Sequence, residues 1–244
     1  MTKIIKVKNL VKTYKEKKAV DNISFEIEEG CLFSLLGVNG AGKSTTIHIL
    51  TGLIPKTSGE VVIDGFNIDN DCEKIKAISN VSFQESSIAL NLTVYENLDL
   101  IASVYAIDDK ETKILEMINM FDLQEYQNTR AKNLSGGYKR RLSIALALLT
   151  NPKILYLDEP TLGLDVLSRN DLWEIIKSLK GKVTILLTTH YLDEVEHLAD
   201  YIAIMKEGKI VASGSLHEIL EKTNTNFLEE AFVLLSKKGG VKHE

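Results

Sequence analysis

The sequence has few cysteines and no long apolar segment. Cys31 and Cys72 are its two cysteines among 244 residues, which argues against a disulfide framework and against a cysteine-based metal cluster. We expect both thiols to be reduced, as in cytoplasmic proteins. No apolar run approaches the ~18 residues that span a bilayer. Charged residues interrupt the short apolar N-terminus, so no signal peptide is expected there.

The sequence also lacks an excess of positive charge. Its 29 Lys and Arg residues against 34 Asp and Glu residues give a net charge of −5. Because domains that bind nucleic acids are usually basic, no nucleic-acid partner is expected. The apolar fraction of 44% and the charged fraction of 26% are ordinary for a globular protein. A chain of this length can form one large α/β domain or two small ones.

Three of the 15 glycines, in contrast, lie in one short and informative stretch. The stretch Gly37–Thr45 has the spacing G-x-x-x-x-G-K-[ST]. It follows the apolar run Phe33–Leu36, which is typical of a buried strand, and it precedes a helical pattern that contains Ile47 and Leu50. With glycine near 7% of residues, chance gives such a match in roughly one window in tens of thousands. We therefore interpret the stretch as a functional loop and not as an ordinary glycine turn.

A loop of this kind binds phosphate. Glycines let the backbone approach phosphate oxygens closely, and the amide N–H groups at the helix N-terminus attract an anion. The Lys43 ammonium would reach the β- and γ-phosphates, and the Ser44 hydroxyl would hold magnesium. The site residues predicted from this loop are Gly37, Asn39, Gly40, Ala41, Gly42, Lys43, Ser44 and Thr45.

A second buried-strand pattern ends in two carboxylates. Ile154–Leu157 is followed by Asp158 and Glu159, and ligands of open α/β sheets bind outside the carboxyl ends of strands. Two carboxylates there suit one magnesium contact and one group that activates water. A strand followed by a solvated acidic turn is common, and it is the phosphate loop that favours the functional interpretation.

A third strand, Val183–Leu187, leads to His190. A single histidine is more often structural than catalytic. Here it follows a strand that would end at the same sheet edge as Gly37 and Asp158, so we predict a phosphate contact for it.

The segment Leu134–Gly137 indicates a second anion-facing helix start. Ser135 suits an N-cap, whereas Gly136 and Gly137 are costly in a first turn unless something approaches closely. The basic run Lys139–Arg141 opposes the helix dipole. A bound anion would make both features favourable.

Helical patterning dominates the middle of the chain. Thr93 and Glu96 form a capping-box pattern, and apolar residues then recur at spacings of three and four. We predict that residues 86–134 form a helical insert between two β-rich parts.

An aromatic residue, Tyr14, stands in a charged loop between the strands predicted before this insert. Tyr14 could stack on a nucleotide base or be a half-buried surface tyrosine.

Together these motifs resemble the ATP-binding subunit of an ATP-binding-cassette (ABC) transporter. The resemblance extends from Tyr14 to about Ser215. It identifies Gly37–Thr45 as Walker A, Leu134–Gly137 as the signature and Ile154–Asp158 as Walker B. Further residues match the family's Q-loop, D-loop and H-loop, in the order Gln84, Asp165 and His190.

The resemblance implies an α/β fold with a P-loop NTPase core, in which helices flank a mostly parallel sheet. An antiparallel β part would lie N-terminal, and a helical subdomain would be inserted. The implied single domain, residues 1–244, divides into a β-rich Walker A half, the helical subdomain, the signature and Walker B half, and a helical tail, with the ranges 1–85, 86–134, 135–215 and 216–244.

The resemblance also implies the cofactors ATP and magnesium. Glu159 would orient or deprotonate the attacking water, and His190 would contact the γ-phosphate. Tyr14 would stack on adenine. Magnesium ligands would be Ser44, Gln84 and Asp158, and the remaining nucleotide contacts would include Ser135, Gly136, Gly137 and Asp165. Tyr138 stands where glutamine is commonest in the signature, and Val38 replaces a frequent proline.

Two partners follow from the resemblance. A second such subunit would pair head to tail, so that the signature of one chain closes over nucleotide held by the other. A separate membrane-spanning permease would place the chain at the cytoplasmic face of the membrane. The run Thr189–Glu196 and Asp200 resemble the branch that exports drugs, antibiotics and ions.

The main alternative is an ABC-type ATPase without a transport role, for example in iron–sulfur assembly. DNA-maintenance members carry a long coiled coil between Walker A and the signature, and the segment between Thr45 and Leu134 cannot contain one. A small kinase or GTPase is disfavoured by the signature and by the lack of an Asn-Lys-x-Asp guanine motif.

Overall fold

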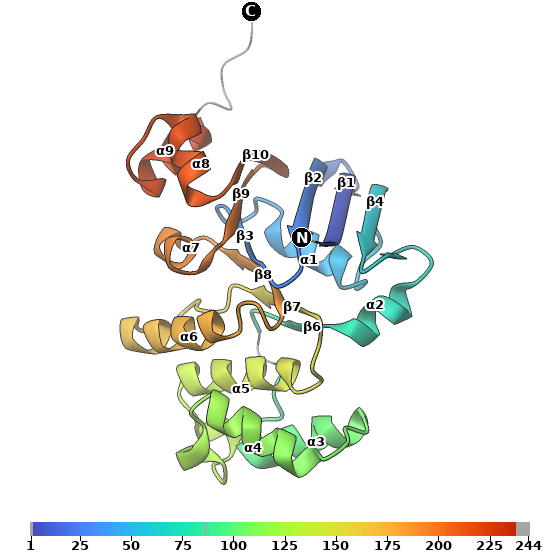
Figure 1. The fold of residues 1–244 in the computed structure, drawn as a ribbon, viewed down its shortest axis with the longest axis vertical. Coiled ribbons are helices and arrows are strands. Elements are labelled where there is room, and N and C mark those ends of the chain that lie inside the picture. The colour runs from blue at the N-terminus through green and yellow to red at the C-terminus, as the bar shows by residue number, and fades with distance from the viewer. Residues whose placement is uncertain (1, 86, 238–244) are drawn as a thin grey trace, which may run out of the picture.

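The computed structural model describes residues 2–85 and 87–237. Residue 86, in the predicted insert, and residues 238–244, in the predicted tail, lie outside the described residues. Figure 1 shows two sheets with helices around them. An antiparallel sheet with the order β2-β1-β4-β5 contains β1 (Lys3–Tyr14), β2 (Lys17–Glu28), β4 (Ser58–Ile63) and β5 (Phe66–Asn67).

The second sheet has six strands in the order β10-β9-β3-β8-β7-β6. Its strands are β3 (Leu32–Leu36), β6 (Ser79–Ser82), β7 (Ile154–Asp158), β8 (Thr184–Thr189), β9 (Tyr201–Lys206) and β10 (Lys209–Gly214). All pairs except β9–β10 are parallel. Glu207 and Gly208, with φ of 48° and 80°, make the tight turn of that antiparallel hairpin. The predicted N-terminal antiparallel part and mostly parallel core sheet are confirmed.

Helices surround the sheets. The α-helices are α1 (Lys43–Leu50), α2 (Cys72–Ile78), α3 (Val94–Val104), α4 (Lys110–Met120), α5 (Gly136–Leu148), α6 (Val166–Ser178), α7 (Leu192–Leu198), α8 (Leu216–Thr223) and α9 (Leu228–Lys237), and short 3-10 turns span Gln124–Tyr126 and Ala131–Asn133. Helix α2 was not expected from the sequence. In Figure 1, α3 and α4 lie at one end of the molecule, and α8 and α9 lie at the opposite end.

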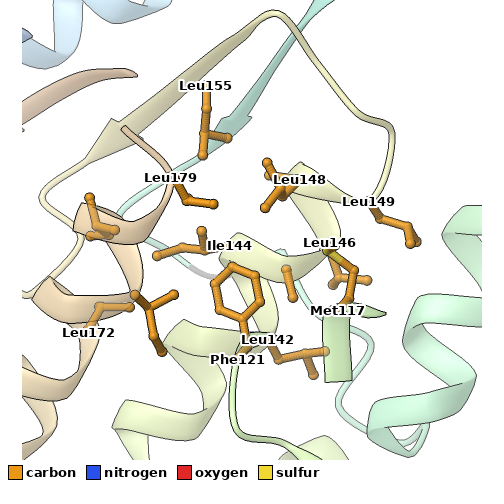
Figure 2. Packing of buried hydrophobic residues seen from close by; sticks show 14 of the residues in the cluster. Met117, Phe121, Leu142, Ile144, Leu146, Leu148, Leu149, Leu155, Leu172 and Leu179 are labelled. Atoms are coloured by element: carbon orange, nitrogen blue, oxygen red, sulfur yellow. The ribbon is translucent and has the colours of Figure 1, made fainter. Parts of the chain in front are cut away.

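Three buried clusters hold these layers together. One fills the space between the two sheets around α1, and a small one fixes α7, α8 and α9 on β9. The largest joins one face of the core sheet to α3, α4, α5 and α6. In Figure 2 Phe121 points toward Leu142 and Ile144 of α5, and Leu155 of β7 lies on the sheet side of the cluster. The signature helix α5 is therefore packed between the core sheet and the helical insert.

Helix α3 begins as the sequence predicts. Thr93 Oγ1 accepts a hydrogen bond from the Glu96 amide at 3.1 Å, and the Glu96 carboxylate accepts one from the Thr93 amide at 2.7 Å. This capping box fixes the direction in which the insert leaves the core.

The phosphate loop packs closely against the backbone of β2 at Gly42. Gly42, the residue before α1, has φ of +106°, and a Cβ built on it would lie 2.3 Å from the Ala19 carbonyl oxygen. A Cβ on Gly40, which has φ of +80°, would meet nothing within 4 Å. Both positions favour glycine conformationally, but only Gly42 is also required by close packing against β2.

We predict that Gly42→Ala destabilises the fold more than Gly40→Ala does. The left-handed backbone costs each alanine about 1–2 kcal/mol, and the clash with Ala19 adds roughly 1–3 kcal/mol for Gly42→Ala. Equilibrium unfolding in denaturant measures both values. Equal losses in the two variants would contradict the packing argument.

Candidate functional site

One pocket lies where the phosphate loop, β1 and the end of β7 meet. Its walls combine glycine backbone, two lysines, hydroxyl groups and one carboxylate, which together suit a bound polyanion. Its lining consists of Tyr14, Lys17, Ala19, Asn39, Gly40, Gly42, Lys43, Ser44, Thr45, Gln84, Glu159 and Leu162. The structure thus gathers residues that the sequence analysis assigned from four separate segments.

A buried ion pair forms the floor of this pocket. Lys43 Nζ lies 3.0 Å from Glu159 Oε1, and the two side chains are 5% and 6% exposed. Lys43 also donates a hydrogen bond of 2.7 Å to the Gly37 carbonyl. The second Glu159 oxygen lies 2.8 Å from His190 Nδ1. Glu159 is therefore held from two sides, by a cation and by an imidazole.

A hydroxyl and a second carboxylate converge beside this pair. Ser44 Oγ donates to Asp158 Oδ1 at 3.0 Å, and the same oxygen accepts a hydrogen bond from Thr188 Oγ1 at 2.5 Å. The arrangement follows from the parallel register, in which Asp158 at the end of β7 lies opposite Thr188 of β8. Asp158 is buried, whereas Ser44 reaches the pocket wall.

Tyr14 and Gln84 lie at the rim. Tyr14 is the last residue of β1, not a loop residue. The residue is 48% exposed, and the Lys12 ammonium lies 4.9 Å from its ring centroid. Gln84 follows β6 and is exposed to the pocket. Gly37 and Ala41 do not line the pocket. They support the pocket from behind its lining, because the Gly37 amide donates a hydrogen bond to the Thr189 carbonyl of β8 and Ala41 is buried.

The signature residues lie outside the lining of this pocket. Ser135 caps α5, as predicted, and its hydroxyl accepts a hydrogen bond of 3.4 Å from the Tyr138 amide. Gly137 is buried against Ser168 of α6, where a Cβ would lie 2.9 Å from the Ser168 hydroxyl. Gly136 is exposed, and a Cβ there would meet nothing within 4 Å.

The D-loop residue Asp165 belongs to this second surface. It caps α6, and its carboxylate accepts two hydrogen bonds from Ser168, from the amide at 3.0 Å and from the hydroxyl at 2.7 Å. These bonds hold the pKa of Asp165 below its usual value. Ser168 thereby joins the D-loop to the signature turn, and neither lines the nucleotide-type pocket of the same chain.

The basic residues of the signature helix are held by protein groups. Arg140 is buried and donates hydrogen bonds to the carbonyls of Phe83, Asp158 and Pro160. Arg141 pairs with Asp122 and Asp171. The interpretation that a bound anion balances the whole run 139–141 is therefore wrong for these two arginines.

Tyr138, the departure from the common signature, turns toward the helical insert. Its ring centroid lies 4.1 Å from that of Tyr126, and the Arg141 guanidinium lies 5.2 Å from the Tyr138 centroid. The Tyr138 ring therefore contributes to the contact between α5 and the insert.

Two further residues were missed by the sequence analysis. Arg140 was noticed only as part of the basic run 139–141, and its carbonyl partners could not be found from the sequence because they are far away in the chain. Glu194 was attributed to the helix dipole of α7, but it is fully buried and accepts a hydrogen bond of 3.1 Å from Trp173 Nε1. Burial raises the pKa of the Glu194 carboxyl. An Asp-Glu pair in a first helical turn could not reveal which of the two faces inward.

Comparison with known proteins agrees with this geometry. The profile of the ABC transporter family matches residues 20–162, more than half of the chain. The chain is 40% identical over 210 residues to the lantibiotic transport ATP-binding protein SrtF of Streptococcus pyogenes, covering 85% of this chain and 89% of SrtF. It is 39% identical over 217 residues to the phospholipid-transporting ATPase ABCA3 of Homo sapiens. That match covers 86% of this chain but 13% of ABCA3.

A solved structure shows the same fold in a dimer. The ATP-binding cassette MJ0796, in a dimeric post-hydrolysis state with ADP and Pi, is similar with a TM-score of 0.78 and 30% identity. The match covers 87% of this chain and 98% of that one. Motifs, pocket and relatives agree, and the chain therefore belongs to the ABC transporter family, as an ATP-binding subunit that hydrolyses ATP.

Proposed function

We propose that this chain drives a separate membrane-spanning permease that exports a drug, antibiotic, ion or lipid-like substrate. The observation that carries the proposal is the phosphate pocket, in which Lys43, Ser44 and Glu159 converge although they come from distant segments. The names of its relatives support transport, because SrtF is a lantibiotic transport ATP-binding protein and ABCA3 is a phospholipid-transporting ATPase.

In the proposed reaction the Lys43 ammonium leaves the Glu159 carboxylate and pairs with the phosphates of the nucleotide. This ammonium pairs with Glu159 at 3.0 Å and would move to the entering phosphates, which leaves the Glu159 carboxylate to accept a proton from the attacking water. His190, 2.8 Å from the other Glu159 oxygen, would orient that carboxylate and contact the γ-phosphate. Tyr14, which is exposed and lines the pocket, would stack on adenine.

The donor set also suits magnesium. Within the described residues no group of three or more His, Cys, Asp or Glu side chains could hold a metal ion. A magnesium ion at a phosphate site takes one or two carboxylates and completes its shell with phosphate oxygens and water. We therefore assign Ser44 and Asp158, whose oxygens lie 3.0 Å apart, as protein ligands, with Gln84 beside them. The ion would neutralise phosphate charge.

The working site is proposed to be shared between two chains. Ser135, Gly136, Gly137 and Asp165 lie outside the lining of the chain's own pocket, and Gly136 has open space where another molecule could approach. A nucleotide bound in the pocket of a partner chain would contact these residues. The dimeric state of MJ0796 provides a precedent for such pairing.

The helical insert is proposed to carry the permease-docking face, which would place the chain at the cytoplasmic side of the membrane. Leu100 and Val104, four residues apart on α3, share a face and are 46% and 69% exposed. Tyr105 and Leu115 add exposed apolar area on the insert. Among the described residues, each helix is too short or too polar to cross a membrane. The boundaries 86–134 proposed for the insert enclose α3, α4 and both 3-10 turns.

A mixed pair of chains tests the shared site. Lys43→Ala damages the phosphate loop, Ser135→Arg damages the signature, and we expect each homodimer to be inactive. In a shared arrangement the mixed dimer has one doubly damaged site and one intact site. The intact one combines the loop of the Ser135→Arg chain with the signature of the Lys43→Ala chain. We therefore expect the differently tagged, purified mixed dimer to regain ATP-stabilised pairing and some hydrolysis.

The control is a dimer of wild-type and Lys43→Ala chains. If this control pairs and hydrolyses ATP while the Lys43→Ala/Ser135→Arg dimer does neither, each site is complete within one chain.

Capture from membranes tests the permease. We expect the tagged full chain to bind one polytopic membrane protein in a fixed ratio, and ATP hydrolysis to change in that complex. Val104→Glu should abolish capture because a charge on the docking face must be desolvated. Val211→Glu is the control, since Val211 is 38% exposed on β10, away from the insert. Recovery with soluble proteins alone would favour the non-transport ATPase instead.

A further inference from the structure

We propose that Arg140 is a positioning residue that couples the nucleotide pocket of this chain to its own signature turn, Ser135–Tyr138. The inference rests on the proposed shared site, in which these two surfaces of one chain serve two different nucleotides. Arg140 then provides the contact through which one site influences the other.

The guanidinium of Arg140 connects α5 to two other segments of the chain, one at Phe83 and one at 158–160. Nε donates to the Pro160 carbonyl at 2.7 Å, and Nη2 donates to the Asp158 carbonyl at 2.7 Å. Nη1 donates to the Phe83 carbonyl. The side chain is 5% exposed, so water does not compete effectively for these carbonyls.

The acceptors are the backbone on either side of the residues that face the phosphates. Asp158 and Pro160 flank Glu159, and Phe83 precedes Gln84. One turn farther along α5, Ser143 Oγ lies 2.9 Å from Ser82 Oγ of β6 and adds a second link to the same strand end. A displacement of the Glu159 or Gln84 loop by nucleotide must therefore displace α5 or break these hydrogen bonds.

Helix α5 carries that displacement to the signature. Ser135 caps the helix and Gly136 is its first residue, so the turn belongs to the same rigid element as Arg140. The hydrogen bonds of Arg140 within the described part of the chain all end on main-chain carbonyls. A buried cation of this kind is expensive to desolvate, and an apolar side chain would stabilise a helix–sheet contact as well or better.

The chemistry also explains why the residue is arginine. Its planar guanidinium presents donors in fixed directions, and it stays charged when buried. Burial lowers the pKa of Arg140 to about 10, still well above neutral pH. A lysine has one ammonium on a flexible stem and cannot hold the carbonyls of both segments in a fixed geometry.

Hydrogen exchange of the separated full-length chain tests the coupling directly. The chain is kept dilute and free of magnesium, so that neither pairing nor hydrolysis contributes, and amides 135–139 are followed with and without saturating ATP. In the wild type we expect ATP to change their exchange rate by about fivefold or more, as usual for coupled sites. Arg140→Gln should abolish this response, and Arg140→Lys should abolish most of it even if the glutamine variant folds poorly.

Arg141→Lys is the matched control. Arg141 is the adjacent buried arginine on the same helix, but its partners are Asp122 and Asp171 and not the strand ends. We expect Arg141→Lys to lower the melting temperature and to keep the ATP response of amides 135–139. A wild-type chain without that response, or an Arg140→Lys chain that keeps it in full, would overturn the proposal.

Steady-state hydrolysis separates this proposal from the shared site itself. In the paired chain we expect ATP hydrolysis with a Hill coefficient above one, falling toward one in Arg140→Lys but not in Arg141→Lys. A purely structural role would lower stability in both variants and leave cooperativity equal. If the mixed-chain dimer fails, the shared site is wrong. If it succeeds and Arg140→Lys remains as cooperative as Arg141→Lys, only the role of Arg140 is wrong.

Discussion

The buried ion pair between Lys43 and Glu159 is the interaction on which the site depends. It joins the start of α1 to the end of β7, at 3.0 Å and with both side chains nearly inaccessible. Two buried charges are costly to desolvate, and further hydrogen bonds are needed to compensate. Here the Gly37 carbonyl and His190 supply them. The pocket therefore holds its own anion beside Lys43, and in the proposed reaction a phosphate that pairs with Lys43 would free the Glu159 carboxylate for catalysis.

The parallel sheet explains why these residues meet. β3, β7 and β8 are neighbours in parallel register, so the chain segments that follow them emerge at one edge and bring Lys43, Glu159 and His190 together. The signature turn is built on a different element, α5, which lies between this sheet and the insert. One chain consequently presents the pocket and the signature turn as two separate surfaces, and Arg140 lies between them.

Sequence reasoning succeeds where the signal is local. The loop Gly37–Thr45, the carboxylates after β7 and the caps of α3 and α5 depend on residues close in the chain, and the structure places them as expected. It fails where a contact is long-range. Arg140 reaches Phe83, 57 residues away, and nothing near Arg140 in the sequence indicates that partner. The roles of the gathered residues toward ATP stay predictions.

Binding of ATP to the separated chain, with magnesium removed, tests the central claim most directly. If phosphate must displace Glu159 from Lys43, Glu159→Gln should bind ATP more tightly than the wild type, by up to about tenfold, while turnover with magnesium is lost. Asp158→Asn removes the neighbouring carboxylate, which does not pair with Lys43, and should tighten binding less. Equal affinities of the two variants, or no gain in Glu159→Gln, would contradict the exchange of anions at Lys43.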